Sequence, residues 1–134
     1  MTPKTIPLPA AWLADLLPEG WPVGGSTVIT GPGGSGKPLV GNVVADAWLR
    51  AGGSLVFLPL QYPDRRFTYE SFRRVTGGDL VDYEERIAFI DLDTTRRDLG
   101  PWKGRGFAAD VVVPTVWRSA IGRACAAVPN EGPG

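Results

Sequence analysis

Histidine is absent from this chain of 134 residues, and cysteine occurs once, as Cys125. The lack of histidine excludes Ser-His-Asp and Cys-His nucleophilic catalysis, histidine acid–base chemistry and histidine metal ligands. A single cysteine excludes an internal disulfide and fits a reducing compartment such as the cytoplasm. No activating residue is visible around Cys125, so we expect a small buried side chain rather than a reactive thiol.

An excess of charge of one sign and long apolar runs are also missing. The 14 basic and 14 acidic residues give a formal net charge of zero, so no nucleic-acid-binding or membrane-binding surface is indicated. No apolar run reaches the roughly 20 residues of a transmembrane helix. The N-terminus, MTPKTIPLPA, lacks the apolar core of a signal peptide. We therefore expect a cytoplasmic protein with no membrane partner.

The composition that remains is typical of a globular protein, with 43% hydrophobic and 21% charged residues in a length that suits one domain. Apolar runs that alternate with helical patterns favour an α/β fold, with a mostly parallel sheet covered on both faces. We divide the chain into an N-terminal extension with a short helix (1–17), one domain (18–128) and a flexible tail (129–134). The predicted strands are Ser26–Thr30, Ser54–Leu60, Arg86–Asp93 and Asp110–Trp117, and the predicted helical segments are Ala10–Leu17, Leu39–Ala51, Thr68–Val75, Leu80–Arg86 and Arg118–Val128.

A glycine-rich segment connects the first of these strands to the helix predicted at Leu39–Ala51. Its sequence, GPGGSGK, matches the G-x-x-x-x-G-K part of a Walker A loop in the strand–loop–helix context that such a loop needs. Glycines let backbone N–H groups surround a phosphate, and the following helix adds a favourable dipole. We prefer this interpretation to an ordinary glycine-rich turn. The predicted nucleotide-binding residues are Gly31, Pro32, Gly33, Gly34, Ser35, Gly36, Lys37 and Pro38.

Pro38 departs from the Walker A pattern, which has serine or threonine after the lysine. The hydroxyl of that residue holds Mg²⁺, and proline removes both the hydroxyl and a backbone N–H. Proline is tolerated in the first turn of a helix, so the fold need not suffer. We therefore expect nucleotide binding to be retained better than metal binding or hydrolysis.

The segment EGWPVGGSTVITGPGGSGK resembles the start of RecA/KaiC-family ATPase domains. SLVFLPLQYPDRRF, TGGDL, RIAFIDLD and ADVVVPTVW are similar, in that order, to the family's second strand, the end of its next helix, its next strand and its Walker B strand. The resemblance covers roughly residues 18–121. It implies a three-layer P-loop NTPase fold that is incomplete at its C-terminal end, with ATP as the ligand. It also implies association with itself or with a related subunit in an oligomer.

The resemblance also locates the catalytic positions. Gln61 stands where the family has a catalytic glutamate, and an amide cannot accept a proton, although it can orient a water molecule. The Walker B aspartate falls near Pro114, which cannot bind a metal, and Asp110 begins that run rather than ending it. The segment Ile87–Asp91 is an alternative Walker B, with four apolar residues before an aspartate. Asp91 could therefore hold Mg²⁺ through a water molecule, unless it is a solvated carboxylate at a strand end.

Three functions remain open. The first is ATP binding with weak or lost hydrolysis, and a chain that is active would be a P-loop ATPase. The second is a non-catalytic regulatory or interaction module that keeps the P-loop scaffold, and the third is a P-loop phosphotransferase acting on a small molecule. Three arginine pairs could contact phosphates, although we favour solvated helix and loop faces for them. They are Arg65-Arg66, Arg73-Arg74 and Arg96-Arg97.

Overall fold

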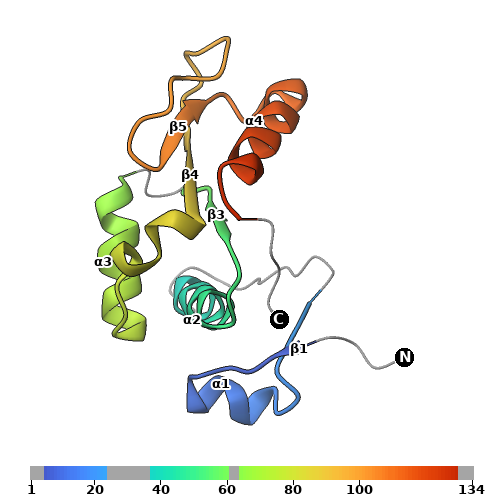
Figure 1. Cartoon of the computed structure of the whole chain (residues 1–134), viewed down its shortest axis with the longest axis vertical. Helices are drawn as coiled ribbons and strands as arrows, with labels where there is room; N and C mark the ends of the chain where they lie inside the picture. Colours follow the sequence, from blue (N-terminus) through green and yellow to red (C-terminus); the bar gives the residue numbers. More distant parts are fainter. Residues whose placement is uncertain (1–4, 24–36, 61–63, 130–134) are drawn as a thin grey trace.

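The computed structural model describes residues 5–23, 37–60 and 64–129. Within them, three parallel strands form a sheet in the order β3-β4-β5 (Figure 1). Strands β1 and β2 form a separate antiparallel pair. The elements are β1 (Thr5–Ile6), α1 (Ala11–Leu16), β2 (Trp21–Pro22), α2 (Lys37–Arg50), β3 (Leu55–Phe57), α3 (Arg65–Thr76), the 3₁₀ segment η1 (Leu80–Arg86), β4 (Ile87–Leu92), β5 (Gly106–Ala109) and α4 (Pro114–Ala126).

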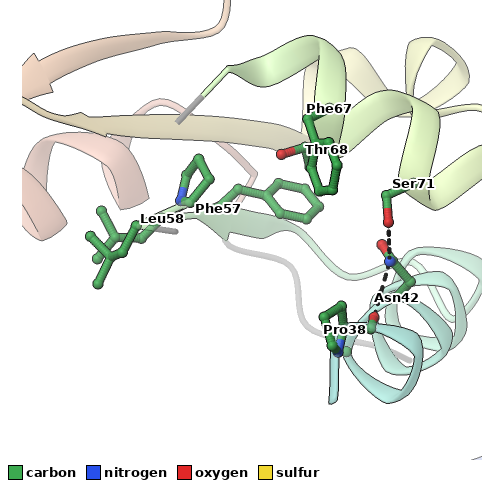
Figure 2. A pocket seen from close by; sticks show the side chains of 10 residues that line it. Pro38, Asn42, Phe57, Leu58, Phe67, Thr68 and Ser71 are labelled. Carbon is green, nitrogen blue, oxygen red and sulfur yellow. Dashed lines mark hydrogen bonds between the residues drawn. The ribbon is translucent and has the colours of Figure 1, made fainter. Parts of the chain in front are cut away.

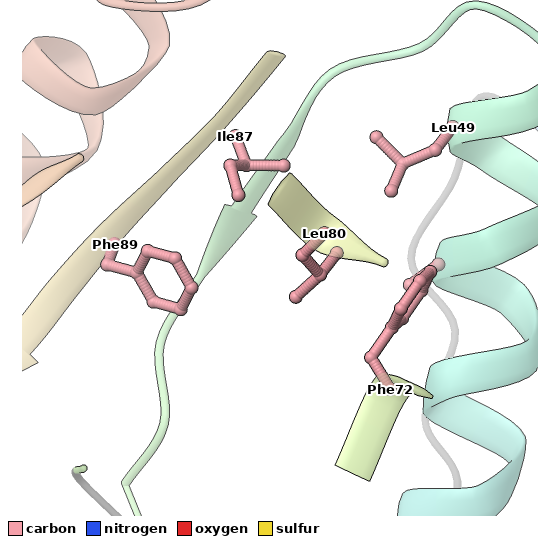
Figure 3. Close-up of a cluster of buried hydrophobic side chains, with 6 residues drawn as sticks. Leu49, Phe72, Leu80, Ile87 and Phe89 are labelled. Atoms are coloured by element: carbon pink, nitrogen blue, oxygen red, sulfur yellow. The ribbon is translucent and has the colours of Figure 1, made fainter. Parts of the chain in front are cut away.

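The central strand β4 is fully buried over its first four residues. Its odd-numbered side chains, Ile87 and Phe89, face a cluster with Leu49 of α2, Phe72 of α3 and Leu80 of η1 (Figure 3). Its even-numbered side chains pack on the other face, in a cluster that includes residues of β5 and α4. Successive strand residues point to opposite faces, so a strand covered on both sides is apolar throughout. The predicted α/β class, with a parallel sheet covered on both faces, is confirmed for the described residues.

Helix α2 also supports the N-terminal segment. Ile6, Leu8 and Leu13 form a third buried cluster with Val43 and Ala47 of α2. Helix α2 therefore contacts the sheet through one side and the N-terminal segment through another.

Helix α3 has defined signals at both ends. The Asp64 side chain accepts the backbone N–H of Arg66 at 2.9 Å, which satisfies one donor of the first turn. Gly77 ends the helix in the left-handed region (φ 74°), where its N–H donates to the Arg73 carbonyl. These two hydrogen bonds therefore define where α3 begins and ends.

The run Asp110–Trp117 does not form the strand that the sequence predicts, and this prediction was wrong. The Asp110 carboxylate accepts the N–H of Val112 at 3.3 Å, its carbonyl accepts that of Val113 at 3.2 Å, and the chain turns. Pro114 then begins α4, where its missing N–H costs nothing. The third strand is β5, immediately before this run. The resemblance of ADVVVPTVW to a Walker B strand therefore does not correspond to a strand here.

The other predicted elements in the described ranges are confirmed to within a few residues, whereas the predicted strand Ser26–Thr30 lies outside those ranges. Cys125 is exposed, which corrects the expectation of a buried residue. It lies on α4 beside Ala124, whose side chain is the one turned into the core. None of the helices described here has the length and apolar character that crossing a bilayer requires.

Two glycines give opposite predictions for alanine substitution. A Cβ at Gly106 would meet the backbone carbonyl and the Cβ of Phe89 on β4, whereas a Cβ at Gly122 on α4 would meet nothing. We expect Gly106→Ala to lower the free energy of unfolding by about 1–3 kcal/mol through overpacking. Gly122→Ala should raise it by about 0.5–1 kcal/mol, because alanine favours the helix. Urea denaturation of both variants checks this, and equal effects of the two substitutions would contradict the packing around Phe89.

Candidate functional site

The first turn of α2 is the described part of the predicted phosphate-binding loop. Gly31–Gly36 lie outside the described residues, so their role stays a prediction, while Lys37 is the first residue of α2 and Pro38 follows it. The expectation that proline is tolerated there is confirmed. The first turn contains no acidic residue, so no carboxylate of this turn offsets the partial positive charge of the helix N-terminus. This end of α2 is therefore favourable for an anion.

A pocket of about 400 Å³ lies beside this turn (Figure 2). It opens between the start of α2, the residues that follow β3 and the first half of α3. Asn42 joins two of its walls, because its side-chain N–H groups donate to the Pro38 carbonyl and to the Ser71 hydroxyl, each at 3.0 Å. The lining residues, none of them charged, are Pro38, Gly41, Asn42, Phe57, Leu58, Pro59, Leu60, Phe67, Thr68 and Ser71.

Asp91 lies at the same edge of the sheet as this pocket. Phe57, the last residue of β3, pairs with Phe89 of β4. Asp91 follows Phe89 by two residues and therefore lies just past the end of β3. The Asp91 carboxylate is in an ion pair with Arg65, with Nη2 at 2.6 Å from Oδ2 and Nε at 3.4 Å from Oδ1. Only 28% of the Asp91 side chain is exposed. Neither interpretation of the sequence anticipated this partner, and the metal role of Asp91 stays a prediction.

The guanidinium of Arg65 makes further contacts with β4 and with the connection between β4 and β5. It donates through Nη1 to the Lys103 carbonyl at 3.1 Å and lies over the Phe89 ring, 5.3 Å from its centroid. A Cβ at Gly104 would come within 3.0 Å of Nη1, and one at Gly106 within 2.9 Å of Nη2. Glycine at both positions leaves the space that the guanidinium fills. The ion pair is therefore built into the connection between β4 and β5.

The structure gives less information about the other predicted catalytic and metal-binding positions. Gln61 lies outside the described residues, and Pro114 lies in α4, which packs on the face of the sheet opposite α2 and α3. Among the described residues, no group of three or more histidine, cysteine, aspartate or glutamate side chains could hold a metal ion.

The arginines that form close ion pairs in the first two arginine pairs are of two kinds. Arg66 and Arg73 are exposed and form surface ion pairs with Asp64 and Asp79, as solvated helix faces predict. The side-chain and backbone N–H groups of Arg66 hold the pKa of Asp64 below its ordinary value. For Asp79, the backbone N–H of Val81 and then the Arg73 side chain lower the pKa. Arg65 differs because it is half-buried. Its pairing with Asp91 depends on the parallel register of β3 and β4, which is known only from the structure.

The arrangement therefore combines a helix N-terminus that favours anions, an uncharged pocket and a neutralised carboxylate at one edge of a parallel sheet. No protein family, curated protein or solved structure matches this chain. The site is interpreted from its own geometry and from the glycine-rich motif that leads into α2.

Replacement of each member of the Arg65-Arg66 pair should separate the built ion pair from the surface one. We expect Arg65→Gln to lower the free energy of unfolding by about 1–3 kcal/mol, because it leaves a half-buried carboxylate without its partner. Arg66, whose side chain is 87% exposed, is the matched control, and Arg66→Gln should change that free energy by less than about 0.5 kcal/mol. Urea denaturation measures both, and equal small losses would contradict the structural role of Arg65.

Proposed function

We propose that this chain binds a nucleoside triphosphate, ATP, through the loop Gly31–Lys37 and hydrolyses it weakly or not at all. The observation that carries the proposal is the position of Lys37, which ends the glycine-rich motif and begins α2. The start of α2 and the residues after β3 line one pocket at the carboxyl end of the parallel strands. Ligands of open α/β sheets bind at that end, and helix N-termini favour phosphate.

The proposed chemistry is electrostatic. The backbone N–H groups of the loop and the Lys37 ammonium group would hold the phosphate oxygens, and the dipole of α2 adds to the attraction. The described residues that line the pocket include no charged side chain, so they offer the phosphates no charged partner there. The pocket is better suited to an uncharged group beside the phosphates.

Three departures from an active ATPase support weak or lost hydrolysis. Pro38 has no hydroxyl to hold Mg²⁺, Gln61 carries an amide in place of the carboxylate that the resemblance implies, and the Asp91 carboxylate is paired with Arg65. The same departures favour the second candidate function, a regulatory or interaction module that keeps the scaffold without catalysis. The two candidates differ in whether ATP binds.

Thermal unfolding tests nucleotide binding. ATP with magnesium at about 100 times its Kd should stabilise the protein by about 2.7 kcal/mol, a shift in Tm of roughly 10 °C for a domain of this size. Lys37→Ala should abolish the shift, whereas Lys103→Ala, at an exposed lysine of the β4–β5 connection, should retain it. If ATP does not shift the Tm of the unmodified protein, the proposed binding is overturned. The second candidate function, a module that binds no nucleotide, then remains.

Steady-state release of phosphate tests the loss of hydrolysis. We expect release from ATP to equal that of the Lys37→Ala variant, because Pro38 and Gln61 replace the hydroxyl and the carboxylate that the resemblance implies for an active ATPase. Among the described residues there is also no group of three or more metal-ligating side chains. A malachite-green assay with saturating ATP measures the release. Sustained release above the Lys37→Ala control would show an active ATPase and contradict the proposed loss.

A further inference from the structure

The P-loop resemblance implies Mg²⁺ as a companion of the triphosphate. In such sites the ion is held by the hydroxyl that follows the lysine and by an aspartate at the end of a strand. Pro38, in the first turn of α2, occupies the hydroxyl position, and its ring carries no donor atom for a metal. The first of the two expected ligands therefore does not fit the ion.

Asp91, the candidate for the second ligand, does not fit either. Both of its carboxylate oxygens accept N–H groups of Arg65, one of them at 2.6 Å. A carboxylate has about four lone-pair sites, and the guanidinium takes two of them, one on each oxygen. A Mg²⁺ ion held there, directly or through a water molecule, would lie beside a fixed positive charge that repels it. Arginine stays protonated in proteins, so no change of pH within the stable range removes this competitor.

The surroundings of Arg65 make the pair a fixed feature of the site. The guanidinium donates to the Lys103 carbonyl and lies over the Phe89 ring. It also lies close to the backbone at Gly104 and Gly106, where a Cβ would approach it. The neighbouring pair between Arg66 and Asp64 has no such enclosure and is largely exposed. A surface pair of that kind contributes little, whereas the Arg65 guanidinium makes two further contacts, with the Lys103 carbonyl and with the Phe89 ring.

We propose that nucleotide binding to this chain requires no divalent metal ion. An unpaired aspartate at this edge would repel a metal-free triphosphate, and a bridging Mg²⁺ would remove that repulsion. Here the Arg65 guanidinium already neutralises Asp91, so this carboxylate adds no repulsion for an ion to remove. The charge of the phosphates themselves is left to the backbone N–H groups and the helix N-terminus that the proposed function assigns to them. This inference rests on the proposed binding of ATP.

Isothermal titration of the whole chain with ATP, in excess magnesium and then in excess EDTA, tests the inference. We expect the two Kd values to agree within about threefold, less than 1 kcal/mol of difference in binding free energy. Binding that weakens about tenfold or more in EDTA overturns the metal independence while leaving the proposed function intact. An absence of binding in both conditions overturns the proposed function, and this inference with it.

Substitution of Arg65 tests the reason for the independence. Arg65→Gln frees the Asp91 carboxylate, so ATP should bind about tenfold more tightly in magnesium than in EDTA, and Pro38→Ser in the same chain should widen the difference. Arg66→Gln removes the same charge from the adjacent residue and should show no preference. Equal Kd values for Arg65→Gln in the two conditions would overturn the role of Arg65. If circular dichroism shows that Arg65→Gln is unfolded, the Pro38→Ser variant is used as the test. Its restored hydroxyl should make ATP bind more tightly in magnesium than in EDTA, and equal Kd values would overturn the inference.

Discussion

Phe89 lies where the sheet, α3 and the Arg65–Asp91 ion pair meet. Its ring is fully buried and stacks on Phe57 at 5.1 Å and on Tyr69 at 5.9 Å between centroids. The guanidinium of Arg65 lies over the same ring. The packing of β4 therefore sets where Arg65 rests, and Arg65 in turn holds Asp91. The electrostatics of the candidate site depend on a contact in the hydrophobic core.

The same core explains which parts of the fold could be predicted. The run from Ile87 to Ile90 is apolar at every position because both of its faces are buried, and this pattern predicts a central strand correctly. Strand β5 has no such signal, since its sequence GFAA contains glycine and alanine, which have low strand propensity. Its strand conformation comes from pairing with β4, and from the room that Gly106 leaves for Phe89. A tertiary contact therefore determines the strand conformation of β5, and no local sequence pattern predicts it.

The opposite error occurs at Val111–Val113, where β-branched residues suggest a strand that does not form. The turn at Asp110 and the proline at the start of α4 outweigh the propensity of three valines. Both errors follow from the same limitation. Propensity describes a residue in isolation, whereas hydrogen bonding to a specific neighbour determines what the chain does.

The candidate site divides in the same way. Lys37 and Pro38 were found by a motif of seven residues and their neighbour, because strand, loop and helix are consecutive in the chain. Arg65 and Asp91 are 26 positions apart, and no spacing rule joins them. They meet because α3 is the next element after β3, and β3 runs parallel to β4 in a register that brings the carboxyl ends of both strands to one edge. In the sequence, Arg65 and Asp91 are recognisable one by one, as a possible phosphate contact and a possible metal ligand, but not as a pair.

The proposed loss of hydrolysis and the proposed independence from metal have one physical origin. Mg²⁺ at a triphosphate does two things, since it balances charge and it polarises the phosphate toward attack by water. The Arg65–Asp91 pair has no net charge, so it adds no repulsion against the phosphates but does not offset their charge. Nor can Arg65 polarise a phosphate from that position, because its N–H groups are already directed at Asp91 and at the Lys103 carbonyl. In the proposed site the loop N–H groups and the N-terminus of α2 therefore hold the phosphates without a group that activates them.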